Sequence, residues 1–173
     1  MEIKRLEPED REALERFLAR VPEGDRTFFK EDVEAPEVVD AWTRPDRARA
    51  VAVEAGEVVG YVAVVPLHGW SSHVGEVRVI VDPDHRGRGV GRALARRAVI
   101  EAAELELSKM VVEVVADQEP TIAMFRSLGF DPEALLTDQV RDQSGSLRDL
   151  MILANSVEAQ WSSMIAAGIA DEL

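Results

Sequence analysis

A glycine-rich turn lies between a run with strand character and a helical pattern, and its chemistry is that of an anion site. Val77–Val81 has the β-branched residues of a strand, and a helical pattern begins near Val90. The first N–H groups of a helix lack partners within the helix, and the helix dipole is positive there, so such a turn attracts phosphate. The turn therefore predicts a phosphorylated ligand, with a pyrophosphate as the first expectation. Its glycines and arginines are Arg86, Gly87, Arg88, Gly89, Gly91 and Arg92.

Two common nucleotide-binding turns do not fit this pattern. A P-loop requires Lys followed by Ser or Thr after its last glycine, whereas Arg92-Ala93 follows here. A dinucleotide-binding turn requires a third glycine at the position of Arg92 and an acidic residue about 20 positions further on, for which Asp117 is the candidate. What remains is the arrangement Arg-x-x-Gly-x-Gly, which runs from Arg86 to Gly91.

This arrangement, together with a second block at Lys109–Phe130, resembles the GNAT superfamily of N-acyltransferases. In that superfamily Arg-x-x-Gly-x-Gly after a strand is the acyl-CoA-binding signature. The second block departs from the family pattern at Gln118, where Asn is common, and at Phe125, where a Tyr is expected. The two blocks span Val77–Phe130, about a third of the chain. The residues that the second block keeps are Glu113-Val114, Ile122 and Leu128-Gly129-Phe130.

The resemblance implies acetyl-CoA as acyl donor and a central strand that is splayed from its neighbour. The unpaired N–H groups of that strand would hold the acyl carbonyl and the pantetheine amide, and the glycine turn would hold the phosphates. The contacts would be made mainly through the backbone, and two residues of the second block would add to them. The expected coenzyme A contacts are Val79, Ile80, Val81, Arg86, Gly87, Arg88, Gly89, Val90, Gly91, Arg92, Gln118 and Phe125.

Acetyl transfer to an amine also requires a group that accepts a proton. Glu113 matches a position that some ribosomal-protein N-terminal acetyltransferases of the superfamily are thought to use. The alternative is a carboxylate that pairs with a neighbouring Arg or orders a water. His68 and His73 precede the central strand, and a His is a suitable base near neutral pH, although a loop His is more often only exposed. For Glu76, on the opposite face from Val77, a structural role is favoured.

The leaving thiolate is protonated by the family tyrosine in most relatives, and Phe125 cannot donate a proton. A free thiol has a pKa of roughly 8.5, so a thiolate leaves near neutral pH without that acid, only more slowly. Tyr61 is the single tyrosine of the chain. It replaces the family acid only if the fold brings it to the sulfur.

Composition narrows the function classes. The net charge of −13 argues against nucleic acid as the main partner and is compatible with a cationic acceptor, although solubility explains the total charge as well. There is no cysteine, which excludes disulfides, thiolate metal sites and a cysteine nucleophile, and no metal is expected. No apolar run reaches the ~18 residues of a membrane span, and the N-terminus MEIKRLEPEDRE has no apolar signal region. A cytoplasmic protein that does not bind membranes is expected.

The order of the expected elements predicts an α+β fold, a mixed and mostly antiparallel sheet with helices on both faces, for which the resemblance supplies the GNAT-like topology. Residues 1–155 are expected to form the domain. Residues 156–173 are expected to form a helix that docks on this domain or makes a homodimer contact. The expected strands are Met1–Leu6, Arg49–Glu54, Val58–Val65, Val77–Val81, Lys109–Ala116, Leu135–Arg141 and Leu147–Leu153. One expected helix starts at Glu7, and a second covers Thr27–Trp42, either unbroken or interrupted. The others cover Val90–Leu107, Asp117–Leu128 and Ser156–Leu173.

These features predict an N-acetyltransferase that moves an acetyl group from acetyl-CoA to a primary amine by direct attack. A small amine is the first expectation for the acceptor, and a protein N-terminus or lysine the second. The rival hypothesis is a non-catalytic acyl-CoA sensor or partner module, which the missing tyrosine motivates. A longer acyl chain is a lesser alternative, because valines surround the expected acyl end.

Overall fold

The computed structural model describes residues 1–22, 25, 29–33, 35–44, 48–142 and 144–168, and its strands form one sheet. The strands are β1 (Glu2–Arg5), β2 (Arg49–Glu54), β3 (Glu57–Pro66), β4 (Val74–Val81), β5 (Lys109–Val115), β6 (Asp131–Arg141) and β7 (Leu147–Ser156). The α-helices are α1 (Arg11–Arg20), α3 (Pro36–Trp42), α4 (Val90–Glu104), α5 (Glu119–Ser127) and α6 (Val157–Ala166), and short 3₁₀ turns lie at Pro8–Asp10, Gly69–Ser71 and Pro83–His85.

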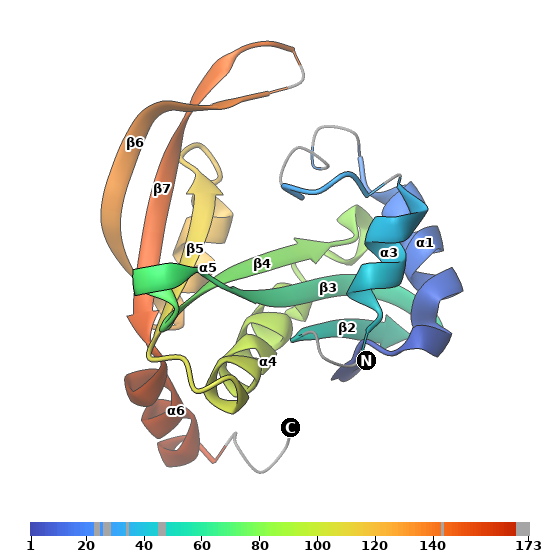
Figure 1. Ribbon diagram of the computed structural model, residues 1–173, viewed down its shortest axis with the longest axis horizontal. Helices are drawn as coiled ribbons and strands as arrows, with labels where there is room; N and C mark the ends of the chain where they lie inside the picture. Colours follow the sequence, from blue (N-terminus) through green and yellow to red (C-terminus); the bar gives the residue numbers. More distant parts are fainter. Residues whose placement is uncertain (23–24, 26–28, 34, 45–47, 143, 169–173) are drawn as a thin grey trace.

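The sheet has the order β1-β2-β3-β4-β5-β7-β6, and β4 and β5 form its one parallel pair among the described strands. The hairpin of β6 and β7 extends beyond the body of the molecule (Figure 1). All other neighbouring strands are antiparallel. This architecture confirms the expected α+β class and its mostly antiparallel sheet.

Apolar side chains fill a core on each face of the sheet. On one face α4, α5 and α6 cover the sheet, with Leu94, Phe125 and Met164 buried. On the other face α1 and α3 cover it, with Phe17 and Trp42 buried (Figure 1). Because side chains alternate along a strand, the central strands β2, β3 and β4 contribute to both cores and are fixed from both sides.

The helix expected over Thr27–Trp42, unbroken or interrupted, is interrupted before Pro36. The described residues 29–33 form bends and a turn, and helix α3 begins only at Pro36; Thr27 itself lies outside the described residues. Pro36 lacks a backbone N–H, and its ring disfavours helical geometry at Ala35, which is extended with φ −78° and ψ 118°. A continuous helix through this proline is therefore excluded, and the segment before it is free to reach the sheet.

Two helix ends also differ from expectation. Helix α4 stops at Glu104, three residues early, because Glu106 has a left-handed backbone with φ 55°. The C-terminal helix is described only over Val157–Ala166. Ile165 is 56% exposed, because eight positions after the buried Val157 the helix has rotated about 80° away from its buried face. Val157 itself is buried, and α6 packs against α4. The division at residue 155 and the homodimer contact stay predictions.

Gly60 on β3 marks the place where α4 lies closest to the sheet. A Cβ at this position would lie 2.8 Å from Leu94 Cδ1 and 3.0 Å from Val90 Cγ1. Both neighbours are buried, so neither can move away freely. We expect Gly60→Ala to lower the free energy of unfolding by about 1–3 kcal/mol, as overpacking does. Urea denaturation measures this change. The control is Ala123→Ser, which adds one atom at an exposed position of α5 and should change the free energy of unfolding by no more than about 0.5 kcal/mol. A Gly60→Ala protein as stable as the parent would contradict the close packing.

Candidate active site

The glycine turn has the geometry that its sequence predicts. Gly87 and Gly89 have φ of 73° and 86°, in the left-handed region that favours glycine, and Gly89 is the N-cap of α4. As a glycine, this N-cap residue has no side chain that could cap the helix end. A Cβ on either glycine would meet no atom within 4 Å, so the turn faces open space. The N-terminus of a 15-residue helix is therefore accessible to an anion.

A cavity runs from this turn along the first turns of α5. Two guanidinium groups flank it: Arg86 pairs with Asp25 and also donates to the carbonyl of Val81, and Arg92 donates to Ser127 Oγ at 2.8 Å. Their positive charge and the helix dipole act on the same end of the cavity. The lining residues are Val79, Val81, Arg86, Gly87, Gly89, Gly91, Arg92, Pro120, Thr121, Met124 and Phe125.

The central strand separates from its neighbour next to this cavity. Strand β4 pairs with β5 only over Val74–Val77, opposite Lys109–Val112, although it pairs with β3 as far as Val81. Beyond Val77 the backbone groups of β4 that face β5 have no strand partner, since half of the N–H groups of a strand point to each side. The expected splay is confirmed, and donors that could hold a carbonyl oxygen lie at the gap.

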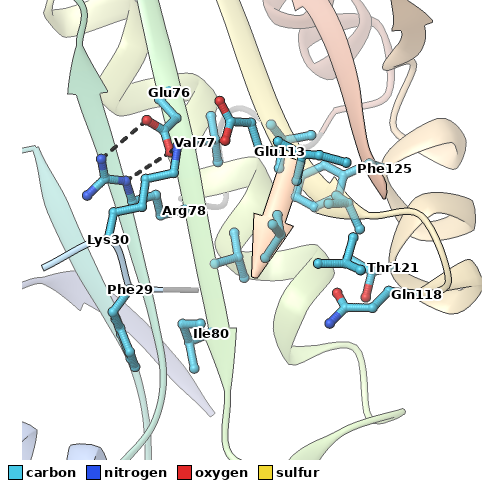
Figure 2. A pocket seen from close by; sticks show the side chains of 16 residues that line it. Phe29, Lys30, Glu76, Val77, Arg78, Ile80, Glu113, Gln118, Thr121 and Phe125 are labelled. Carbon is cyan, nitrogen blue, oxygen red and sulfur yellow. Dashed lines mark hydrogen bonds and ion pairs between the residues drawn. The ribbon is translucent and has the colours of Figure 1, made fainter. Parts of the chain in front are cut away.

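A second cavity opens at the splay on the other side of Val79, and charged side chains gather at one end of it. Figure 2 shows Glu76 and Glu113, from β4 and β5, beside Lys30. Lys30 Nζ lies 2.9 Å from Glu76 Oε1 and 2.6 Å from Glu113 Oε2. The two carboxylates come from the separating strands and face the same side of the sheet. The remaining walls are largely apolar, with Phe29, Val77, Val79, Ile80, Val112, Val114, Val115, Phe125, Val140 and Leu150 among the lining residues.

Arg78 holds Glu76 in place. Its Nε and Nη2 donate to the two carboxylate oxygens of Glu76 at 3.0 and 3.2 Å, and its Nη1 donates to Glu31 at 2.9 Å. Burial alone would raise the pKa of Glu76, but the hydrogen bonds from Arg78 and Lys30 outweigh it and keep the pKa below its usual value. Glu76 therefore carries a negative charge in the cavity near neutral pH.

Of the three predicted catalytic residues, only Glu113 lines one of the two cavities described above, whereas His73 and Tyr61 line neither. Glu113 lines the cavity at the splay. His73 is exposed before β4, and its described contacts are made by its carbonyl oxygen, which accepts from the N–H of Ser108. Tyr61 is 1% exposed, stacks on Trp42 at 4.8 Å and receives a hydrogen bond from Arg49. Burial raises the pKa of Tyr61, and the residue lines neither cavity, so nothing in this placement supports it as the acid.

The predicted coenzyme A contacts fall into two groups. Ten of them line the two cavities or a neighbouring one beside Asp25; the two exceptions are Arg88 and Val90. Arg88 is exposed at the turn, and the side chain of Val90 is buried in the core. Val90 can contribute its backbone N–H in the first turn of α4. The ten lining residues are Val79, Ile80, Val81, Arg86, Gly87, Gly89, Gly91, Arg92, Gln118 and Phe125.

Four of the lining residues that were not predicted from the sequence bear on the chemistry of the site. Thr121 and Met124 lie on α5, and Thr121 precedes Phe125 by four positions, a helical spacing that could have indicated it. Arg78 alternates with Glu76 on a buried strand, and two charges at this spacing are a usable signal. Lys30 lies in a segment without regular structure, and no local pattern indicates it.

Comparison with known proteins decides the family. The model of the Acetyltransferase (GNAT) family matches residues 11–130. The chain belongs to this family. It is 28% identical over 135 residues to the uncharacterized N-acetyltransferase YjgM of Escherichia coli, covering 75% of this chain and 81% of that one. It is 31% identical over 105 residues to the L-amino acid N-acyltransferase MnaT of Escherichia coli, covering 60% of each chain.

The fold of a solved GNAT-type structure agrees with this assignment. The structure of yncA from Salmonella typhimurium with its cofactor acetyl-CoA superimposes with a TM-score of 0.77 at 21% identity, covering 90% of this chain and 93% of that chain. The GNAT chain described here is thus an N-acetyltransferase enzyme that takes its acetyl group from acetyl-CoA and passes it to an amine. Within the part of the chain that the structure describes, no helix has the length and apolar character needed to cross a membrane.

Proposed function

We propose that the two cavities are the donor and acceptor halves of one active site, and that acetyl transfer occurs by direct attack where they meet at Val79. The observation that carries this proposal is the splay of β4 from β5, which lies between the glycine turn and the carboxylates. In the donor half, the first turn of α4 and Arg86 hold the phosphates of acetyl-CoA. The free N–H groups of β4 beyond Val77 bind the thioester carbonyl and stabilise the oxyanion that forms from it.

Glu113 is the proposed proton acceptor in this GNAT enzyme. It lines the acceptor half of the site, where an amine could lie within hydrogen-bond distance of its carboxylate. The amine nitrogen forms a bond to the carbonyl carbon, the carbon–sulfur bond breaks, and the proton of the amine passes to Glu113. The thiolate of coenzyme A departs and takes up a proton from water. Direct attack fits a chain without cysteine, in which a thiol ester on the enzyme is excluded.

Phe125 contributes shape rather than a proton. It is 1% exposed, packs edge-on against Phe130 at 5.2 Å, and lines both cavities at their junction. A phenyl ring here can pack against the pantetheine arm but cannot protonate the leaving sulfur. A thiolate departs near neutral pH without such an acid, so the missing tyrosine slows the transfer and does not abolish it. His73 is given no role, because its side chain is exposed outside both cavities.

The acceptor is a primary amine, with a small amine favoured over a protein N-terminus or lysine. Two acidic side chains in the acceptor half favour a cation over a neutral or anionic acceptor. A cytoplasmic location, a homodimer and the absence of nucleic-acid and membrane partners stay predictions.

The absence of cysteine makes the decisive experiment clean, because a thiol reagent detects only released coenzyme A. Protein and acetyl-CoA are mixed with polyamines, amino acids, aminoglycosides and peptide N-termini, and thiol release is followed. We expect release with at least one class of amine, well above the rate without amine. Binding of acetyl-CoA by calorimetry together with no release from any class would support the alternative, a non-catalytic acyl-CoA sensor or partner module.

A further inference from the structure

One ammonium group already lies between the two carboxylates of the acceptor half. Lys30 Nζ contacts Glu76 and Glu113 at 2.9 and 2.6 Å, and these carboxylates belong to different strands. Figure 2 shows the lysine arm entering from the side of Phe29 towards the gap between β4 and β5. An ammonium group held by two carboxylates at the splay lies where an acceptor amine would bind before its proton passes to Glu113 in the proposed mechanism.

The two carboxylates are held by strands of the sheet, whereas the ammonium group comes from a segment without regular structure. Glu76 is 7% exposed and is held by two hydrogen bonds from Arg78. Lys30 comes from a segment without helix or strand, and 41% of its side chain is exposed. Burial would lower the pKa of Lys30, but its hydrogen bonds to Glu113 and Glu76 raise it, so the group stays an ammonium. A partly exposed arm on an irregular segment can leave the carboxylates without disturbing the sheet.

We propose that Lys30 occupies the binding position of the acceptor and must be displaced by it, and that the acceptor is a primary amine on an unbranched carbon chain with no carboxylate beside the amine. This inference rests on the proposed function of the same site. A lysine side chain is itself such an amine, a four-carbon chain that ends in an ammonium group. The walls around it suit a carbon chain, because Phe29, Ile80 and Val114 are apolar.

The charges around the position of the Lys30 ammonium disfavour an amino acid as the acceptor. When Lys30 leaves, Glu76 and Glu113 lose their shared cation. Arg78 is already engaged, since its Nε and Nη2 donate to Glu76 and its Nη1 donates to Glu31. The α-carboxylate of an amino acid would then lie close to two acidic side chains, and like charges at this distance in a partly buried site disfavour binding. A linear amine carries no such group.

The test is Lys30→Ala with n-butylamine as the acceptor, because this amine has the four-carbon chain and the ammonium group of a whole lysine side chain. In the parent enzyme only the fraction with Lys30 displaced can bind the acceptor, and the substitution removes this competition. We expect the KM for n-butylamine in the thiol-release assay to fall about tenfold or more, with kcat within about twofold. The matched control is Lys109→Ala, which removes a partly exposed lysine paired with Glu133 and should change neither value.

Two results would overturn the inference. An unchanged or higher KM for n-butylamine in Lys30→Ala would show that Lys30 does not occupy the acceptor position. A higher kcat/KM for L-alanine than for n-butylamine in the parent enzyme would contradict the substrate class. Calorimetric binding of n-butylamine to both proteins without acetyl-CoA gives a second readout: tighter binding to Lys30→Ala supports the position even where transfer is absent. Absence of transfer from the parent enzyme to every amine would instead contradict the proposed function alone.

Discussion

Gly89→Glu is expected to abolish measurable binding of acetyl-CoA. Gly89 is the N-cap of α4 and faces the cavity that we assign to the phosphates, so a glutamate there places a negative charge where a pyrophosphate must bind. Like charges brought together cost several kcal/mol, and every ~1.4 kcal/mol is tenfold in affinity, so the loss should be about 100-fold or more. Isothermal calorimetry with acetyl-CoA measures this loss directly.

The chain offers a matched control for this substitution. Gly145 in the turn of the β6–β7 hairpin has φ 85°, almost equal to the 86° of Gly89, and a Cβ there would also meet no atom within 4 Å. Gly145→Glu therefore adds the same charge and a similar backbone strain away from the glycine turn, and it should bind acetyl-CoA like the parent. Gly89→Ala separates strain from charge and should lose less affinity than Gly89→Glu. Near-normal binding by Gly89→Glu would mean that the phosphates bind elsewhere.

Glu113→Gln is expected to lower kcat by about 100- to 10,000-fold, the range that a general base contributes. Glutamine keeps the size of the side chain but cannot take the proton of the attacking amine. The affinity for acetyl-CoA should stay within about threefold, because Glu113 lines the acceptor cavity and not the cavity at the glycine turn. Steady-state thiol release and calorimetry on the same protein separate the two effects.

Glu133→Gln is the control for the loss of one negative charge. Glu133 on β6 is exposed and pairs with Lys109, outside both cavities, so its substitution should leave kcat unchanged. A Glu113→Gln protein with kcat within about threefold of the parent would show that Glu113 only pairs with Lys30 and that another group accepts the proton. An increase in KM alone would indicate that Glu113 binds the ammonium without acting as a base.

The sequence by itself determined the glycine turn that we propose as the donor half of the site. A strand, a glycine turn and a helix follow one another within 18 residues, from Val77 to Leu94, so the whole anion site is a local feature of the chain. Positive φ at Gly87 and Gly89 is needed by the turn itself, and this need is visible in the spacing of the glycines. The departure at Phe125 was equally readable, because a missing hydroxyl group is a property of one residue.

The partners in the acceptor half became visible only in the tertiary structure. Lys30 and Glu113 are 83 positions apart, and no periodic pattern connects them. The interruption before Pro36 puts Lys30 in an irregular segment, and the sequence did not decide whether the helix expected over Thr27–Trp42 was interrupted. The place of Tyr61 also could not be read from the sequence. Side chains alternate between the two faces along β3, but only the packing of Tyr61 against Trp42 and Arg49 shows that its hydroxyl group lies in a core.

The difference between the two halves of the site follows from the sequence separation of the residues that form each of them. Backbone conformation at a glycine turn, helix capping and strand alternation depend on neighbours a few positions away, and the sequence states those neighbours directly. Ion pairs such as those of Lys30 depend on which elements the two cores bring together, and those cores combine residues from the whole chain. The sequence thus determined where acetyl-CoA is expected to bind, and the packing of the sheet decided which charges meet the amine.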